Sequence, residues 1–196
     1  MKSEVDRIPG SLVFVGRLVP GKGVHVLLQA LHQLKQEGIQ PPLTVIGDGH
    51  QRAILEKLTE VLGLTGQVSF SGVVKGEKLV EVLNRHDIMV IPSVWNEPFG
   101  VVALEGAACG CYIVGTENGG LPEAIGNCGT VVPNNNADAL ANGIQHALLR
   151  PPRGEDFSIS RNQHLERHTP EAMVNGYLAI LIDARREYGS STTKAG

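Results

Sequence analysis

Short, nearly all-apolar segments alternate along the chain with longer segments in which apolar residues recur every three or four positions. The short segments are typical of parallel strands covered on both faces, and the longer spacing is typical of amphipathic helices. The strands predicted in this way are Ser11–Gly16, Leu43–Gly47, Val68–Ser71, Ile88–Pro92, Tyr112–Gly115 and Thr130–Pro133.

Four apolar stripes at helical spacing lie between or after these strands, and Asn136 is a candidate N-cap for the last stripe. This alternation predicts an α/β fold with a single Rossmann-like, doubly wound, six-stranded parallel sheet. The stripes are Val24, Leu27, Leu28, Leu31 and Leu34; Ile54, Leu55, Leu58 and Leu62; Leu79, Val82 and Leu83; and Ala139, Leu140, Ile144, Ala147 and Leu148.

The character of the chain changes after Leu149. Two consecutive prolines cannot continue a helix, so residues 150–156 are predicted to form a loop. Two helices are expected to follow, near Ile159–Arg167 and Pro170–Glu187, the second capped by Thr169. The expected division is an N-terminal extension (1–10), a Rossmann-like donor-binding domain (11–149), C-terminal helices (150–188) and a disordered tail (189–196).

The charge of the chain mainly excludes one class of partner. The 196 residues include 17 Lys and Arg against 20 Asp and Glu, for a net charge of −3. Nucleic-acid-binding domains usually carry a basic excess, so no nucleic-acid partner is expected. The apolar runs are far shorter than a membrane span, and residues 1–9 lack the apolar core of a signal peptide. We expect a cytoplasmic protein.

Three cysteines, Cys109, Cys111 and Cys128, are too few for a disulfide framework in a chain of this length. The Cys-Gly-Cys sequence could bind a metal or perform redox chemistry, but no paired Cys or His motif completes a set of four ligands. We favour small apolar cysteines in packed positions and assign no metal ligand.

Ligands of doubly wound sheets bind beyond the carboxyl ends of the strands, so the loops after the strands are the candidate sites. The first loop, Gly16–Gly23, nearly matches the phosphate-loop pattern, but Gly23 stands where a Ser or Thr would hold magnesium. Arg17 and Lys22 remain as a cationic pair beside a helix N-terminus, which attracts anions. The alternative is a solvated loop with two ordinary surface charges.

The second loop, Gly47–Arg52, begins like a dinucleotide-binding fingerprint but has Arg52 in place of the third small residue. No acidic residue stands about 20 positions further on, where the fingerprint requires one. A tight strand-to-helix turn is the better interpretation.

The third loop places Glu97 and Glu105 eight positions apart, with Pro98 and Gly100 between them. Pro98 favours a boundary, so Glu97 is expected on the loop and Glu105 one or two turns into the next helix. Two carboxylates at one strand end suit a polyol such as ribose or a hexose. The N–H groups of Gly100 and Val101 would face an anion. The alternative is a capping acid and an unrelated surface glutamate.

The fourth loop contains Gly119 and Gly120 before a short predicted helix. Such a pair permits the close approach of a phosphate or a sugar, or it merely forms a turn. This pattern by itself does not distinguish the two.

In order and spacing, these motifs resemble the nucleotide-binding half of a GT-B glycosyltransferase, most closely family 4, the glycosyl transferases group 1 type. The resemblance covers residues 11–149 and implies the C-terminal half of a GT-B fold, with a UDP- or GDP-sugar as donor substrate and no further cofactor. It is carried by Val15–Arg17, Lys22–Gly23, Gly47–Gly49, Val68–Gly72, Pro92–Ser93, Glu97–Glu105 and Gly119–Glu123.

The resemblance also implies a role for each matching residue. Arg17 and Lys22 would bind the donor diphosphate in place of a metal, and Glu97 would face the transferred sugar; these three are the candidate catalytic residues. Glu105 would hold the ribose hydroxyls. The other donor contacts would come from Gly16, from Val74 or Lys75 near the base, from the backbone of Phe99, Gly100 and Val101, and from Gly119 and Gly120.

Enzymes of this family retain the anomeric configuration of the sugar and hold the acceptor, a glycan or a lipid-linked group, on an N-terminal domain. The chain starts near the first strand of the second domain, so we expect it to be inactive alone and to need that domain or a partner chain. The full enzyme could associate peripherally with a membrane. The closing helix would then expose an apolar patch formed by Leu178, Ile180, Leu181 and Ile182.

Three other functions stay open, one of them a sugar-nucleotide epimerase on the same architecture. A P-loop NTPase or nucleotide switch is suggested by Gly16–Lys22 and would depend on magnesium. A non-catalytic nucleotide-sugar-binding subunit would share every donor contact, so the sequence does not separate it from an enzyme.

Overall fold

One parallel sheet forms the centre of the molecule. The computed structural model describes residues 7–149, 154–172, 174–175 and 178–182. Within them, six strands pair in the order β3-β2-β1-β4-β5-β6, and every pair is parallel. The strands are β1 (Ile8–Val15), β2 (Leu43–Ile46), β3 (Val68–Gly72), β4 (His86–Ile91), β5 (Tyr112–Thr116) and β6 (Gly129–Val132). The predicted doubly wound α/β fold is confirmed.

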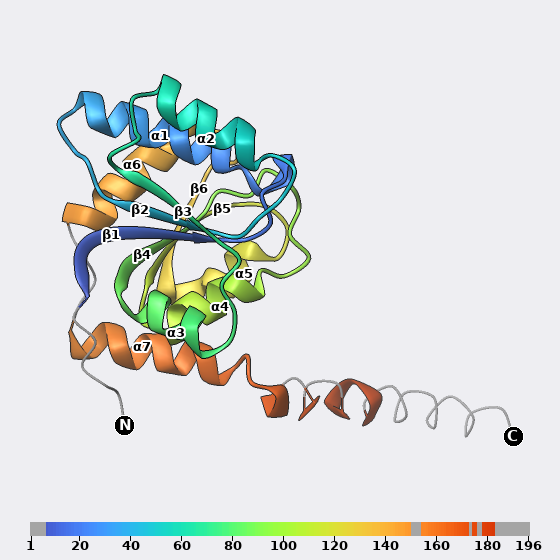
Figure 1. Cartoon of the computed structure of the whole chain (residues 1–196). Coiled ribbons are helices and arrows are strands. Elements are labelled where there is room, and N and C mark those ends of the chain that lie inside the picture. The colour runs from blue at the N-terminus through green and yellow to red at the C-terminus, as the bar shows by residue number, and fades with distance from the viewer. Residues whose placement is uncertain (1–6, 150–153, 173, 176–177, 183–196) are drawn as a thin grey trace, which may run out of the picture.

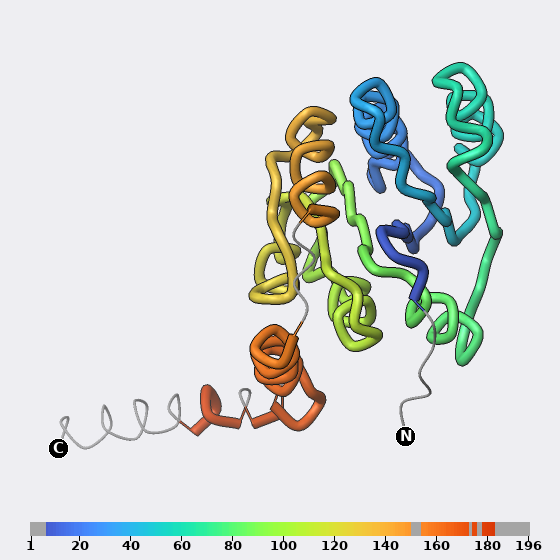
Figure 2. The backbone as a smooth tube through the Cα atoms, turned by 90° about the vertical axis from the view of Figure 1, so that its left-hand side faces the viewer, coloured from blue at the N-terminus to red at the C-terminus, as the bar shows by residue number. Residues whose placement is uncertain are grey.

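Helices cover both faces of this sheet. They are α1 (Val24–Gln36), α2 (Arg52–Val61), α3 (Glu77–Asn84), α4 (Val101–Ala108), α5 (Leu121–Ile125), α6 (Ala137–Leu149) and α7 (Glu155–Glu166). Helices α1, α2 and α6 lie on one face, at the top of Figure 1, and α3, α4, α5 and α7 lie on the other side. Figure 2, turned by 90° about the vertical axis, shows the same layers, with α7 below the sheet.

Alternate residues of the central strands enter two separate cores, because successive side chains of a strand point to opposite faces. In β1, Leu12 and Phe14 pack with residues of α1, α2 and α6, whereas Val13 packs with residues of α4 and α5. Since both faces are covered, the strands are nearly continuous apolar runs in the sequence.

The second core contains the cysteines. Cys111 and Cys128 are fully buried there, and Cys109 packs against the same cluster. Burial raises the pKa of the Cys111 thiol to about 12, so the thiol stays protonated and behaves as a small apolar group. The interpretation of the cysteines as packing residues is confirmed.

The boundaries that differ most from the sequence prediction are the starts of β1 and α7. Strand β1 begins at Ile8, inside the expected N-terminal extension, because the Ile8 amide donates a hydrogen bond to the Arg85 carbonyl (2.8 Å) beside β4. Helix α7 begins at Glu155 rather than near Ile159, and its first turn contains Glu155 and Asp156. Acidic side chains are favourable in a first turn, so this helix starts inside the segment predicted as a loop.

Two predicted N-caps are confirmed. Asn136 Oδ1 accepts a hydrogen bond from the Ala139 amide (2.9 Å) at the start of α6, and Thr169 Oγ1 accepts one from the Ala172 amide (3.1 Å). Residues 170–172, 174–175 and 178–182 are helical. The rest of the predicted last helix, residues 150–153 and the tail 189–196 lie outside the described residues.

The last described helical residues extend away from the sheet (Figure 1). Their apolar side chains are exposed, as the sequence predicted; they are Leu178, Ile180, Leu181 and Ile182. None of the helices in the described ranges is both long enough and apolar enough to cross a membrane.

Strands β5 and β6 approach so closely at Gly129 that a Cβ there would lie 2.0 Å from the Ile113 carbonyl oxygen. We therefore expect Gly129→Ala to lower the free energy of unfolding by about 1–3 kcal/mol, the usual cost of overpacking. Gly66 is the matched control, because a Cβ there meets no atom within 4 Å. Gly66→Ala should change the free energy by less than about 0.5 kcal/mol. Chemical denaturation measures both values, and equal losses would contradict the prediction.

Candidate functional site

The loops after β1 and β4 meet at the middle of the sheet edge. The chain builds β2 and β3 on one side of β1 and then returns to place β4 on the other side. The crevice at such a reversal is where doubly wound sheets bind ligands. The Gly21 carbonyl in the first loop accepts hydrogen bonds from the amides of Val94 (2.9 Å) and Trp95 (3.2 Å) in the third loop. The backbone itself therefore joins these two loops.

A lysine–glutamate ion pair connects the same loops through side chains. Lys22 Nζ lies 2.6 Å from Glu97 Oε1, although the two residues are 75 positions apart. The Ser93 hydroxyl donates a second hydrogen bond to the same oxygen, also at 2.6 Å. The side chains of Lys22 and Glu97 keep 29% and 12% of their surface exposed. The pair is thus partly shielded from water and still open to a ligand.

The pKa of the Glu97 carboxyl lies below its ordinary value. Burial by itself would raise this pKa, but hydrogen bonds from Lys22 and Ser93, together with the charge of Lys22, outweigh burial. The carboxyl group is therefore ionised at neutral pH.

Gly119 and Gly120 lie directly against the third loop. The Gly120 amide donates to the Glu97 carbonyl (2.8 Å). A Cβ on Gly119 would lie 2.1 Å from that carbonyl oxygen, and one on Gly120 would lie 2.6 Å from the Pro98 carbonyl oxygen. In this structure these two glycines allow the close approach of the backbone of the neighbouring loop.

Helix α4 begins immediately after this loop. Gly100 has a φ of 97°, in the left-handed region, and no side chain caps the helix N-terminus. A Cβ on Gly100 would meet Leu121 at 2.8 Å, so the residue is enclosed by α5. Phe99 is half-buried and Val101 is exposed beside it.

Arg17 follows β1 at the same edge and is exposed. Its side chain makes no hydrogen bond or ion pair with the residues that the structure describes. Gly16 is part of the sheet edge, where its amide donates to the Ile46 carbonyl (3.0 Å).

The first loop differs from a phosphate-binding loop in how its amides are used. The amides of Leu18, Lys22 and Gly23 donate to carbonyl oxygens of the protein itself. A phosphate-binding loop instead turns its backbone N–H groups toward the phosphates. In this chain the amides of Lys22 and Gly23 form local turns, and that of Leu18 donates to the Asp48 carbonyl in the second loop. The cationic groups that this loop brings to the edge are therefore the side chains of Arg17, which is exposed, and Lys22, which is paired with Glu97.

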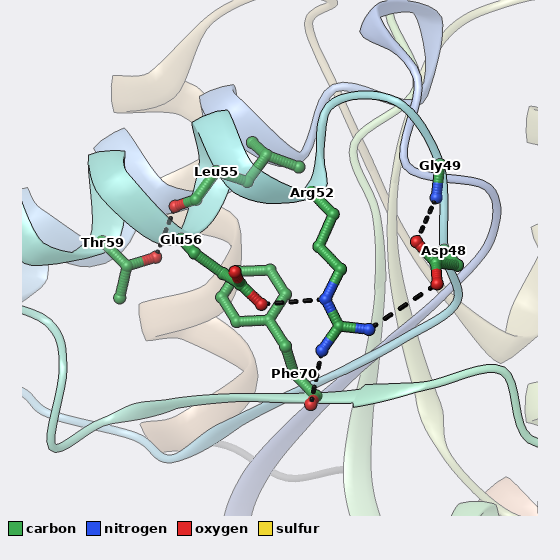
Figure 3. Close-up of polar contacts among 7 residues, drawn as sticks. All are labelled: Asp48, Gly49, Arg52, Leu55, Glu56, Thr59 and Phe70. Carbon is green, nitrogen blue, oxygen red and sulfur yellow. Dashed lines mark hydrogen bonds and ion pairs between the residues drawn. The ribbon is translucent and has the colours of Figure 1, made fainter.

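The second loop is a tight turn, as the sequence predicted. Figure 3 shows Arg52, the first residue of α2, reaching from the helix toward Asp48 in the turn, Glu56 and the Phe70 carbonyl. Arg52 Nε lies 2.8 Å from Glu56 Oε1, and Nη1 lies 3.7 Å from Asp48 Oδ2. The hydrogen bond to Glu56 is the main reason why the pKa of Arg52 is raised. Arg52 holds the turn to α2 and β3.

Three residues predicted to contact the donor make no side-chain hydrogen bond or ion pair with this cluster within the described ranges. Val74 packs against the second core, and Lys75 is exposed after β3. Glu105 is the fifth residue of α4, as predicted, and is exposed without a hydrogen bond or ion pair among the described side chains.

Sequence reasoning named Ser93 only as part of a matching segment and missed the polar residues bonded to it beneath the third loop. The Ser93 carbonyl accepts hydrogen bonds from Thr116 Oγ1 (2.6 Å) and Asn118 Nδ2 (2.9 Å). All three residues are buried. The available signal was a polar residue at the end of each of two apolar strands.

Helix α7 also reaches this loop, which no motif indicated. The ring of Phe99 lies 5.5 Å from that of His168, just after α7, and the His168 ring lies 4.6 Å from that of His164. The buried His164 places Nε2 3.0 Å from the Ala124 carbonyl in α5. The end of α7 therefore supports the segment that carries Phe99.

The fold defines a Rossmann-like α/β domain, and the charged pair lies at the edge beyond β1 and β4 where such domains bind ligands. Within this class, the family model of glycosyl transferases group 1 matches residues 4–163, so the chain belongs to that family.

Its relatives include the D-inositol 3-phosphate glycosyltransferase of Rhodococcus erythropolis, 30% identical over 94% of this chain and 44% of that protein. HepE of Anabaena, solved with UDP and glucose, has the same fold, with a TM-score of 0.75 and 23% identity over 90% of this chain and 48% of HepE. The sucrose-phosphate synthase of Thermosynechococcus elongatus has a TM-score of 0.71 and 29% identity, over 91% of this chain and 47% of that one. The chain spans less than half the length of these relatives.

The lowered pKa of Glu97 predicts a pH-dependent contribution to stability. A depressed carboxyl pKa stabilises the fold above the unfolded-state value, about 4.3, and this contribution is lost as the pH falls through the lower folded-state value. The difference in unfolding free energy between the native chain and Glu97→Gln should be constant near neutral pH and shrink between about pH 5 and pH 3.

Chemical denaturation at a series of pH values measures this difference. Glu60→Gln is the control, because the ion pair of Glu60 with Lys57 is largely exposed and should contribute little at any pH. A Glu97→Gln difference that does not change with pH would contradict the assigned ionisation.

Proposed function

We propose that the chain is the nucleotide-sugar donor-binding domain of a retaining glycosyltransferase that transfers a hexosyl group to a sugar, glycan or lipid acceptor. One observation carries the proposal. A lysine and a glutamate from two distant loops are paired at the chain reversal, and the arginine on the same loop as the lysine has no partner among the residues that the structure describes. A nucleotide sugar requires cations that bind its diphosphate and a hydrogen-bond acceptor that binds its sugar hydroxyls.

The named ligands of relatives support the choice of donor class. HepE was solved with UDP and glucose, and a Mycolicibacterium smegmatis relative with 28% identity is named as a GDP-mannose-dependent mannosyltransferase. Both donors share the diphosphate and the hexose and differ in the base. We infer a UDP- or GDP-hexose for this chain.

In this proposal each part of the edge contacts a part of the donor. Arg17 and Lys22 bind the diphosphate beside Gly16, and Glu105 binds the ribose hydroxyls. Glu97 faces the hexose, and the base lies near Val74 and Lys75. The backbone of Phe99, Gly100 and Val101 contacts sugar and phosphate, next to Gly119 and Gly120.

The proposed reaction retains the anomeric configuration. The bond from the anomeric carbon to the bridging phosphate oxygen breaks, and its electron pair stays on that oxygen. The acceptor oxygen attacks from the same face, and its proton passes to a donor phosphate oxygen. Negative charge therefore grows on the diphosphate, where Arg17 and Lys22 stabilise it without a metal ion.

The acceptor site is expected to come from a second domain, because the chain spans less than half of its relatives. This chain alone would then bind donor without transferring sugar. The exposed apolar residues 178 and 180–182 are a suitable face for that domain. Peripheral membrane association would be a property of the whole enzyme.

Calorimetric titration of UDP, GDP and ADP, with magnesium and then with EDTA, tests the donor assignment. We expect one nucleotide to bind with little dependence on metal. Arg17→Ala should weaken its binding by about 1.5–3 kcal/mol, or roughly ten- to 150-fold, because one charged hydrogen bond is lost.

Lys35→Ala is the control, since Lys35 lies in the last turn of α1 at the opposite end of that helix from Lys22. Binding that requires magnesium would favour an NTPase instead. An Arg17→Ala variant that binds like the native chain would remove Arg17 from the site. Transfer of the sugar after addition of a candidate N-terminal half would exclude a non-catalytic binding subunit.

The proposed ribose contact makes a separate prediction. Glu105→Ala should weaken binding of the nucleoside diphosphate while sparing inorganic pyrophosphate, because only the former carries ribose hydroxyls. Competition titrations with both ligands measure the two effects, with the exposed Glu60→Ala as control. Equal losses for both ligands would refute the ribose role.

A further inference from the structure

The hydroxyl group of Ser93 is buried and hydrogen-bonded to the carboxylate of Glu97. Ser93 lies two residues after the end of β4, and only 1% of its surface is exposed. Its Oγ donates to Glu97 Oε1 at 2.6 Å, the same carboxylate oxygen that Lys22 contacts at 2.6 Å. Within the described residues, no hydrogen bond reaches the other oxygen, Oε2. One carboxylate oxygen is thus held by the protein, and the other is free to accept a ligand hydroxyl.

The backbone of Ser93 is itself fixed from the neighbouring strand. Its carbonyl accepts hydrogen bonds from Thr116 at the end of β5 and from Asn118 just beyond, and both residues are buried. Ser93 is therefore fixed from the sheet and in turn fixes a carboxylate four residues further along an irregular loop. Rigid support of this kind is what a precisely placed binding group needs.

Lys22 cannot supply the same support once an anion arrives. In the proposed function the Lys22 ammonium also binds the donor diphosphate, so its contact with Glu97 is shared or lost. The Ser93 hydroxyl is uncharged and is buried beneath the loop. We therefore expect its hydrogen bond to Glu97 to persist when the diphosphate binds.

We propose that Ser93 is a positioning residue that holds Glu97 Oε1, so that Oε2 is presented to a hydroxyl of the transferred sugar when Lys22 turns to the diphosphate. This inference rests on the proposed function, because it takes Glu97 as the group that faces the sugar. Thr116 and Asn118 contribute by fixing the Ser93 backbone, and none of the three needs to touch the donor.

Two measurements on Ser93→Ala test this role. The first is the titration of the Glu97 carboxyl carbon by NMR, with Glu97→Gln to assign the signal. We expect the pKa of Glu97 to rise, because a hydrogen bond to the ionised form is removed. The second compares binding of the nucleotide sugar with binding of its nucleoside diphosphate by calorimetry. Nucleotide-sugar affinity should fall roughly two- to tenfold, the effect of one ordinary hydrogen bond, while nucleoside diphosphate affinity stays unchanged.

Ser11→Ala is the matched control for the loss of a buried serine hydroxyl. Ser11 is also 1% exposed and bonds a backbone carbonyl, that of Ile8, in β1. The Ser11→Ala variant should have a lower free energy of unfolding than the native chain and the same Glu97 pKa. Ser93→Ala should also have no further effect on nucleotide-sugar binding in the Glu97→Gln background, because a positioning residue acts through the group that it positions.

An unchanged Glu97 titration in Ser93→Ala overturns the proposal. So does an equal loss of affinity for nucleotide sugar and nucleoside diphosphate, which would mean a general structural role. If the native chain binds no nucleotide, the proposed function fails on its own experiment, and the Glu97 titration still decides whether Ser93 holds the carboxylate.

Discussion

The candidate site depends on the parallel pairing of β1 with β4 at the centre of the sheet. These strands are far apart in the chain, because β2 and β3 are built between them and lie on the other side of β1. Their carboxyl ends nevertheless point the same way, so the loops that follow them leave from one edge. The pairing thereby brings Lys22 within hydrogen-bond distance of Glu97. Without this register, the two charges would belong to unrelated surface loops.

Backbone contact then fixes how closely the loops pack. Gly23, with a φ of 68°, lies where a Cβ would be 1.8 Å from the Pro92 carbonyl oxygen, and Gly119 has a comparable place against Glu97. At such distances no side chain separates the loops, so their positions follow the strands rather than the rotamers of long residues. The side chains that emerge from these loops are consequently placed by the sheet itself. The ring contacts of His168 and His164 add support from α7 on the other side of Phe99.

The charge of Glu97 is compensated within the protein. Glu97 would be costly to bury as an unpaired charge, and Lys22 and Ser93 compensate that cost through its Oε1 atom. Arg17 is left exposed without a protein partner within the described ranges. The candidate site thus contains one cation, Lys22, that is bonded to a carboxylate, and a second, Arg17, whose side chain is exposed. In the proposed function, a diphosphate would contact Arg17 without displacing any contact of that side chain to a described residue. Its contact with Lys22 would be shared with Glu97.

The sequence alone determined the fold class and the identity of the candidate loops. Periodicity is a local property, so the apolar runs located all six strands, and the caps at Asn136 and Thr169 followed from residue type. Spacing also placed Glu97 on a loop and Glu105 inside α4. Only the tertiary structure decided that Glu97 shares one oxygen between Lys22 and Ser93, and that Gly119 and Gly120 face a neighbouring backbone. It also decided that β1 starts at Ile8 and that α7 supports Phe99. These features arise from contacts between residues tens of positions apart, which local patterns do not encode.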